Sequence, residues 1–155
     1  KKGRKHILYI IREMLDFKPV SRKTDIGEAV AFFTRVMKRR CTAFLLSDFY
    51  DRKDFQKQLQ IANNKHDLMA IQVYDKLSKS LPDVGLLKVC DAETGHEQYI
   101  DTSSKQLRAA HARYWTEREE KLKQTFSRSN VDWVSVATDE DFVKALMILF
   151  ASRNG

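Results

Sequence analysis

Cysteine, proline and glycine are all scarce in this sequence. It contains two cysteines, two prolines and five glycines among 155 residues. So little glycine and proline favours long regular elements over elaborate loops. Cys41 and Cys90 lie in apolar stretches and match no paired metal or redox spacing, so we interpret them as free thiols in a reducing compartment.

Long apolar runs are also missing. The longest, Ala145 to Ala151, has seven residues, whereas roughly 20 are needed to span a bilayer. No secretory signal pattern is visible, so we expect a soluble, cytoplasmic protein. Apolar residues make up 43% and charged residues 32%, which excludes a disordered or collagen-like chain. The length fits one domain with its own core, so residues 1–155 are predicted to form a single domain.

The motifs of common catalytic sites are absent as well. The sequence has no glycine-rich phosphate loop, no nucleophile elbow, no His-Glu-x-x-His and no Cys-x-x-Cys. Its four histidines share no metal-ligand spacing. No complete catalytic set is present, so the chain is predicted not to be an enzyme and resembles half of a binding site.

Positive charge is in surplus but is not concentrated. Lysine and arginine total 28 against 21 acidic residues, a net charge of +7. The basic clusters at residues 1–5 and 38–40 are short, and the basic residues from Arg113 onward alternate with glutamates. Single-strand binders need a basic stripe interleaved with aromatic residues. We therefore do not expect nucleic-acid binding and interpret the charges as a solvated surface.

Hydrophobic periodicity predicts an alternation of helices and strands. Apolar residues at helical spacing and capping residues predict helices over residues 4–16, 25–37, 51–64, 103–127 and 142–150. Short apolar runs predict buried strands over residues 41–47, 68–74 and 131–137. Two alternating runs, residues 85–91 and 98–101, flank Ala92-Glu93-Thr94-Gly95 and predict a hairpin inserted at about residues 84–101.

This alternation indicates an α/β fold with three parallel strands flanked by helices and an inserted β-hairpin. Three strands make a thin sheet, and strands as apolar as residues 41–47 usually lie in its middle. The chain also opens without methionine, directly on a basic cluster. We therefore expect a fragment whose sheet lacks its other half. Strand 41–47 is then expected to have an unpaired apolar edge, open to edge-to-edge self-association.

Candidate site residues follow from the carboxyl ends of the predicted strands, where open α/β sheets bind ligands. Asp48, directly after strand 41–47, is placed to hold a metal or a nucleophile, or merely to cap a turn. Asp51 is interpreted as a helix cap. Thr24 and Asp25, at the end of Ser21-Arg22-Lys23-Thr24-Asp25, are placed to hold an ion or to cap the helix that follows. Asp101 to Ser104 is interpreted as the N-cap of the long helix.

Several segments in a fixed order carry a resemblance that covers nearly the whole chain. The segments are Phe17-Lys18-Pro19, Ser21-Arg22-Lys23-Thr24-Asp25-Ile26, Lys38-Arg39-Arg40, Leu46-Ser47-Asp48-Phe49, Leu81-Pro82-Asp83-Val84-Gly85-Leu86-Leu87, Asp91-Ala92-Glu93-Thr94-Gly95 and Asp101-Thr102-Ser103-Ser104. In this order the chain resembles the bacterial domain-of-unknown-function family fifty-eight.

Members of that family contain a von Willebrand factor type A (vWA)-like domain, which implies a Rossmann-type three-layer fold. The adhesion site of such a domain draws an Asp-x-Ser-x-Ser motif, a Thr and an Asp from three loops. Thr24 matches the Thr and Asp48 the Asp, with Ser47 and Asp25 beside them expected to contact the partner. No Asp-x-Ser-x-Ser occurs in the sequence. The chain therefore resembles the C-terminal half of a vWA-like domain.

The resemblance also implies a cofactor and partners. An intact adhesion site would hold Mg²⁺, but one hydroxyl and one carboxylate hold it poorly, so no metal is expected to bind this chain alone. Family members are commonly encoded beside MoxR-type AAA+ ATPases and are thought to act in chaperone-like maturation of other proteins. A non-enzymatic protein-interaction module is therefore expected. The alternative is a Mg²⁺-dependent nuclease or phosphatase using Asp48 with Asp75.

Overall fold

A parallel sheet forms the centre of the computed structural model of this chain, which describes residues 3–19, 24–91 and 94–151. Its order is β1-β2-β5, with both pairings parallel. The strands are β1 (Thr42–Ser47), β2 (Asp67–Tyr74) and β5 (Asp132–Ala137). The prediction of an α/β fold with three parallel strands is confirmed.

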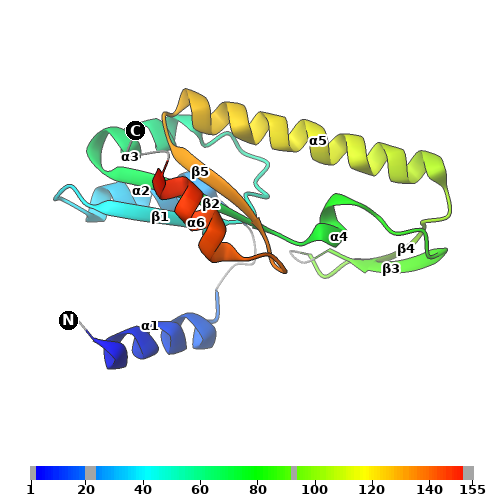
Figure 1. Cartoon of the computed structure of the whole chain (residues 1–155), viewed down its shortest axis with the longest axis horizontal. Coiled ribbons are helices and arrows are strands. Elements are labelled where there is room, and N and C mark those ends of the chain that lie inside the picture. The colour runs from blue at the N-terminus through cyan, green and yellow to red at the C-terminus, as the bar shows by residue number, and fades with distance from the viewer. Residues whose placement is uncertain (1–2, 20–23, 92–93, 152–155) are drawn as a thin grey trace.

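Helices cover the two faces of this sheet unequally (Figure 1). Residues of α2 (Ile26–Val36), α3 (Gln56–Lys65) and α5 (Lys105–Arg128) pack on one face. Only α6 (Phe142–Ala151) packs on the other, within the described residues. The arrangement has three layers, helices, sheet and helix.

Strand β2 supplies both cores because successive side chains of a strand point to opposite faces. Leu68 and Ala70 belong to the larger cluster with α2, α3 and α5. Met69 and Ile71 belong to the smaller cluster with α6. Of the run predicted as buried over residues 68–74, residues 68–72 are buried because they lie between two layers, whereas Val73 is exposed and Tyr74 is half-buried.

Strand β1 lies at an edge of the sheet. Ala43 and Leu45 pack against the larger core, but Phe44 and Leu46 are 46% and 61% exposed. Within the described residues β1 pairs on one side, with β2. The expected unpaired apolar edge is confirmed for this part of the chain.

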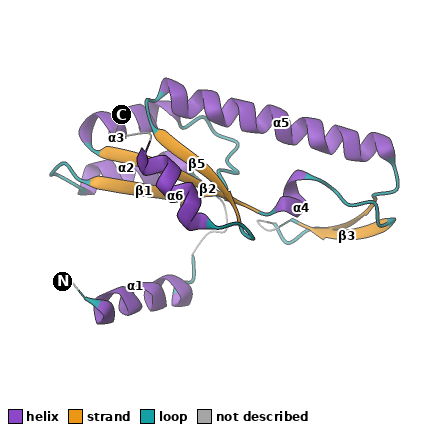
Figure 2. Ribbon diagram, in the orientation of Figure 1, coloured by secondary structure: helices purple, strands orange, loops and turns teal. Residues whose placement is uncertain are grey.

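The inserted hairpin forms a sheet of its own. Strands β3 (Leu86–Cys90) and β4 (Glu97–Asp101) pair antiparallel, which confirms the hairpin predicted over residues 84–101. Ala92 and Glu93 of the predicted turn lie outside the described residues. A short helix, α4 (Lys76–Lys79), precedes the hairpin where the sequence pattern predicted only a loop (Figure 2).

The start of α3 differs from the prediction. This helix begins at Gln56, with Phe55 as its N-cap residue, and not at Asp51. The Oδ1 atom of Asp54 accepts the Gln56 N–H at 3.0 Å. The interpretation of Asp51 as the cap of this helix was wrong because its carboxylate binds the N-terminus of α2 instead.

The first helix, α1 (Arg4–Asp16), has the predicted bounds and lies apart from the sheet (Figure 1). None of its residues is buried in the described chain. Among the helices that the structure describes, none combines the length and apolar character needed to span a bilayer.

Candidate functional site

The carboxyl ends of the three strands open on one cavity, beside α5. Its volume is about 390 Å³. Asp48, Asp75 and Thr138, which follow β1, β2 and β5, all line it. Open α/β sheets bind ligands at this edge. The cavity's α5 wall consists of His111, Tyr114, Trp115 and Arg118.

The loop after β1 is a tight turn held by its own side chains. The Ser47 hydroxyl accepts the Phe49 N–H at 2.9 Å, and Oδ1 of Asp48 accepts the Tyr50 N–H at 3.0 Å. Phe49 has a φ of 54°, in the left-handed region that few non-glycine residues adopt. Its side chain is only 3% exposed. Ser47 and Asp48 therefore cap a turn, and Asp48 remains exposed at the surface.

The segment before α2 is tied to this loop by two acidic residues. Asp25 caps α2, with its Oδ1 accepting the Glu28 N–H at 2.8 Å, and its Oδ2 pairs with Lys53 at 2.5 Å. Oδ2 of Asp51 accepts the Ile26 N–H at 2.8 Å. Thr24 is half-buried beside them, and Ser21 to Lys23 lie outside the described residues. The loops that hold Thr24 and Asp48 are thus joined through Asp51 and Lys53.

The ion pair between Lys53 and Asp25 shifts the pKa values of both groups at this junction, where the segment before α2 meets the loop after β1. The hydrogen bond from Lys53, assisted by the Glu28 N–H, lowers the pKa of Asp25. The same pair raises the pKa of Lys53. Both carboxylate oxygens of Asp25 are engaged inside the chain, so its capping interpretation is confirmed, whereas its contact with a partner stays a prediction.

Arg118 fixes the other side of the loop and was not predicted as a site residue. Its Nη2 donates to the carbonyl oxygen of Asp48 at 2.9 Å. Its guanidinium carbon lies 4.4 Å from the ring centroid of Tyr50 and 5.3 Å from that of Trp115. Nothing in the local sequence pattern indicated this contact with the Asp48 backbone.

Trp115 is the second residue that the sequence pattern missed. It is 6% exposed, and its Nε1 has no hydrogen-bond partner among the described atoms. Trp115 lies four residues after His111 and three before Arg118, so helical spacing places all three on the same face of α5. That spacing could have indicated Trp115 as a site residue. The Nε2 atom of His111 lies 2.7 Å from the carbonyl oxygen of Ser78.

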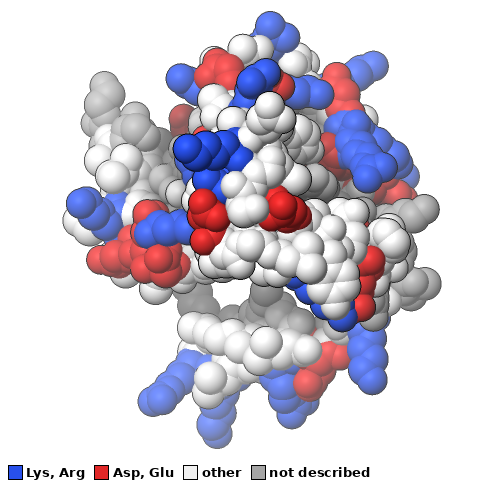
Figure 3. Space-filling model, turned by 90° about the vertical axis from the view of Figure 1, so that its right-hand side faces the viewer, with Lys and Arg blue, Asp and Glu red and all other residues white. Residues whose placement is uncertain are grey.

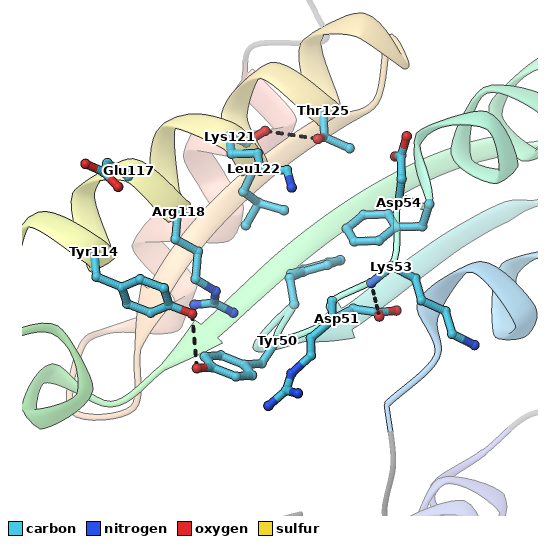
Figure 4. A pocket seen from close by; sticks show the side chains of 13 residues that line it. Tyr50, Asp51, Lys53, Asp54, Tyr114, Glu117, Arg118, Lys121, Leu122 and Thr125 are labelled. Carbon is cyan, nitrogen blue, oxygen red and sulfur yellow. Dashed lines mark hydrogen bonds between the residues drawn. The ribbon is translucent and has the colours of Figure 1, made fainter. Parts of the chain in front are cut away.

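A second hollow of about 460 Å³ adjoins this site, between residues 49–55 and α5 (Figure 4). The hydroxyls of Tyr50 and Tyr114 meet at 3.2 Å across its mouth. This contact raises the pKa of Tyr50. The second hollow is lined by charged residues of both signs. They are Arg52, Lys53, Arg118 and Lys121 with Asp51, Asp54 and Glu117.

The residues present do not fit a magnesium site. Among the described residues, no group of three or more His, Cys, Asp or Glu side chains could hold a metal ion. Thr24 and Asp48 supply one hydroxyl and one carboxylate, so waters would have to complete most of the octahedral set of oxygens that Mg²⁺ takes.

Comparison with known proteins gives the family. Residues 1–121 match the family described as "Protein of unknown function DUF58", which is well over half of the chain. The chain belongs to the DUF58 family. This confirms the family predicted from the ordered segments of the sequence.

Similar proteins occur in mycobacteria. An uncharacterized protein of Mycobacterium avium is 28% identical over 135 residues, which cover 87% of this chain and 79% of the relative. Uncharacterized proteins of Mycobacterium tuberculosis and Mycobacterium bovis are each 28% identical over 155 residues, which cover 97% of this chain. The chain spans about half the length of these two relatives, 48%.

Membership in DUF58 names no activity, because the function of the family is unknown and these relatives are uncharacterized. No solved structure matches the chain.

Proposed function

We propose that this DUF58 chain is a non-enzymatic protein-interaction module of the vWA type, which contacts its partner through the loops at the carboxyl ends of its strands. The observation that carries the proposal is the junction of two loops far apart in sequence. Asp51 binds the Ile26 N–H at 2.8 Å and Lys53 binds Asp25 at 2.5 Å. These contacts join the segment with Thr24 to the loop with Asp48.

The junction gives the site a fixed shape, as partner recognition requires. Arg118 holds the Asp48 backbone from the α5 side, while the side chain of Phe49 anchors the same loop in the core. Binding residues occur disproportionately on loops that a rigid scaffold positions. Asp48 is exposed on this fixed loop, where a partner can reach it.

The partner class rests on the resemblance to the family. Its members are commonly encoded beside MoxR-type AAA+ ATPases, and a chaperone-like role in the maturation of other proteins follows from that pairing. We therefore propose a MoxR-type AAA+ ATPase of the same organism as the partner. The exposed carboxylate of Asp48 is proposed as its contact point.

Removal of this carboxylate tests the contact. We expect Asp48→Ala to abolish binding of the purified MoxR-type ATPase, measured by surface plasmon resonance, and to leave the chain folded, with only a small drop in the unfolding midpoint from the lost hydrogen bond to the Tyr50 N–H. Glu97→Ala is the matched control, because Glu97 is an exposed acid on the β3–β4 hairpin, paired with Lys88. Unchanged binding by Asp48→Ala would show that this contact mechanism is wrong.

A hydrolytic function is the second candidate, favoured by the placement of Asp48 and Asp75 on one cavity. Oδ1 of Asp75 is engaged at the start of α4, where it accepts the Leu77 N–H at 2.8 Å. We expect calorimetric titration of MgCl₂ into this chain to give no saturable binding, and p-nitrophenyl phosphate to stay intact in its presence. Saturable Mg²⁺ binding with hydrolysis lost in Asp75→Asn would favour the enzyme.

A further inference from the structure

The second hollow, between residues 49–55 and α5, contains cations without counter-ions. Arg52, Arg118 and Lys121 all line it, and none of the three forms an ion pair with the residues that the structure describes. Arg118 is half-buried, and a partly buried charge without a partner costs free energy. An unpaired guanidinium in this position is suited to receive an anion.

The guanidinium of Arg118 is held in place by its neighbours. Its carbon lies 4.4 Å from the ring centroid of Tyr50 and 5.3 Å from that of Trp115. One N–H donates to the Asp48 carbonyl oxygen, which leaves the other N–H groups of Arg118 for a ligand. In Figure 4 the side chain extends from α5 toward Tyr50. Because the group is already ordered, little side-chain entropy is lost when it binds an anion.

The acidic side chains of the hollow do not neutralise these cations. Both carboxylate oxygens of Asp51 accept backbone N–H groups at 2.8 Å, and one oxygen of Asp54 accepts another at 3.0 Å. Glu117 is exposed and points away from the loop after β1 in Figure 4. The fourth cation of the lining, Lys53, pairs with Asp25. The other three cations are therefore left for a ligand.

The charge of the lining indicates how much negative charge the ligand carries. Four basic and three acidic residues line the hollow, a surplus of one positive charge. Basic and acidic groups are also interspersed over the face of the molecule in Figure 3. Such a surface suits a single carboxylate better than a polyanion such as a nucleic acid.

The shape of the lining indicates what surrounds that carboxylate. The planar guanidinium of an arginine matches a carboxylate through two parallel hydrogen bonds. The side chains of Tyr50 and Tyr114 are 43% and 51% exposed, so their rings are accessible to apolar groups of a ligand. The volume of about 460 Å³ lies in the range of ligand pockets and has room for a few side chains.

We propose that the second hollow binds a peptide segment of a protein partner in which one glutamate or aspartate is flanked by aromatic residues. Arg118 binds the carboxylate, with Arg52 and Lys121 beside it, and the rings of Tyr50 and Tyr114 contact the flanking residues. This site does not use the Asp48 side chain, so it does not rest on the proposed function.

An NMR titration of the isotope-labelled chain with the blocked peptide acetyl-Phe-Glu-Phe-amide tests this site. We expect saturable shifts of the Arg118 Nε–H signal and of the amides of residues 50–55, with a dissociation constant on the order of millimolar or below. The neutral peptide acetyl-Phe-Gln-Phe-amide should bind at least about tenfold more weakly, because it cannot form the charge-assisted hydrogen bonds.

Three outcomes of this titration would overturn the proposal. The first is the absence of saturable shifts, and the second is equal affinity for the two peptides. The third is binding of sodium acetate as tightly as the glutamate peptide, which would show a site for small anions and not for a peptide segment.

Variants of the chain assign the binding to the named cations. We expect Arg118→Gln to weaken binding of the glutamate peptide at least about tenfold, and Lys121→Gln about threefold, since Lys121 is exposed to solvent. Lys121→Gln leaves the contacts of Arg118 with the loop intact, so it tests the site even if Arg118→Gln loosens that loop. Arg113→Gln makes the same change of charge at an exposed position of α5 and is the control.

The variants also separate this proposal from the proposed function. Asp48→Ala should bind the glutamate peptide at least as tightly as the wild type does, even though it is expected to lose the ATPase. Weakening by Arg113→Gln equal to that by Lys121→Gln would show attraction by net charge alone and overturn the site. Full binding by both Arg118→Gln and Lys121→Gln would overturn it as well.

Discussion

The two faces of the central sheet differ in how completely they are covered. On the face beneath α2, α3 and α5, Leu59, Ala62 and Phe126 are fully buried. On the opposite face the buried cluster is small: Met69, Ile71, Val136 and Leu149. Apolar residues are common on both faces, so what differs is the number of elements that cover them.

Helix α6 shows the same contrast within one element. Its body from Ala145 to Ala151 is wholly apolar, yet Leu149 is buried while Met147 and Ile148 are exposed. Hydrophobicity therefore identified α6 as an element that packs on the sheet but did not indicate how much of it is covered. The difference between the two faces can be measured.

The largest expected effect is the loss of packing on the covered face. We expect Leu59→Ala to lower the free energy of unfolding by about 3 kcal/mol, because a fully buried leucine leaves a cavity. Leu46→Ala should change it by less than about 0.5 kcal/mol, since Leu46 is exposed on the β1 edge. Urea unfolding of both variants measures the contrast. Equal losses would show that the outer side of β1 is packed.

A smaller effect is expected at the carboxyl-end loops. Arg118→Ala removes the hydrogen bond to the Asp48 carbonyl and the contact with the Tyr50 ring, so we expect a loss of about 1–2 kcal/mol. Arg118→Lys should recover less than half, because lysine lacks the planar guanidinium. Urea unfolding measures this loss in the free energy of unfolding, and the amides of residues 48–50 should show faster hydrogen exchange in Arg118→Ala. Arg113→Ala, exposed on the same helix, is the control and should change neither.

A pH-dependent contribution is expected from the cap of α2. The pKa of Asp25 is lowered, chiefly by Lys53, so the folded state favours the ionised carboxylate. This contribution to stability is present at pH values above 3.8, the ordinary pKa of the carboxyl group. It is lost as the pH falls through the lowered pKa of Asp25 in the folded state. Asp25→Asn keeps a capping side chain but removes the charge.

Thermal unfolding from pH 7 to pH 2 measures this contribution. The wild type should be more stable than Asp25→Asn by roughly a few degrees at pH 7, and the difference should vanish in acid. A difference that persists unchanged at pH 2 would contradict the role of the charge.

The smallest effect concerns the tyrosine pair at the mouth of the second hollow. The hydrogen bond to Tyr114 raises the pKa of Tyr50 above 10.0. The resulting contribution to stability is fully present below pH 10.0 and is lost as the pH rises through the pKa of Tyr50 in the folded state. Tyr114→Phe should move the pKa of Tyr50 toward 10.0. An NMR titration of the Tyr50 ring signals follows this group separately from the other tyrosines, and an unchanged pKa of Tyr50 would exclude the contact.

The sequence predicted the elements better than the site. Apolar periodicity and capping chemistry placed α1, β1 and α5 within about two residues of their bounds. Asp51 was misassigned because a carboxylate near a helix start can bind any N–H within reach, and its partner Ile26 lies 25 residues away. Arg118 was missed for the same reason, since its partner, the Asp48 carbonyl, lies 70 residues away. Local patterns do not indicate such long-range contacts.

Phe49 links the stability of the exposed loop after β1 to that of the core. Its backbone has the left-handed φ of 54°, and its ring lies 5.0 Å from that of Phe126 and 6.2 Å from that of Phe55. Glycine would relax the backbone but empty the core, whereas another large side chain would keep the conformational cost. We therefore expect the loop that presents Asp48 to unfold together with the core on heating, in a single cooperative transition.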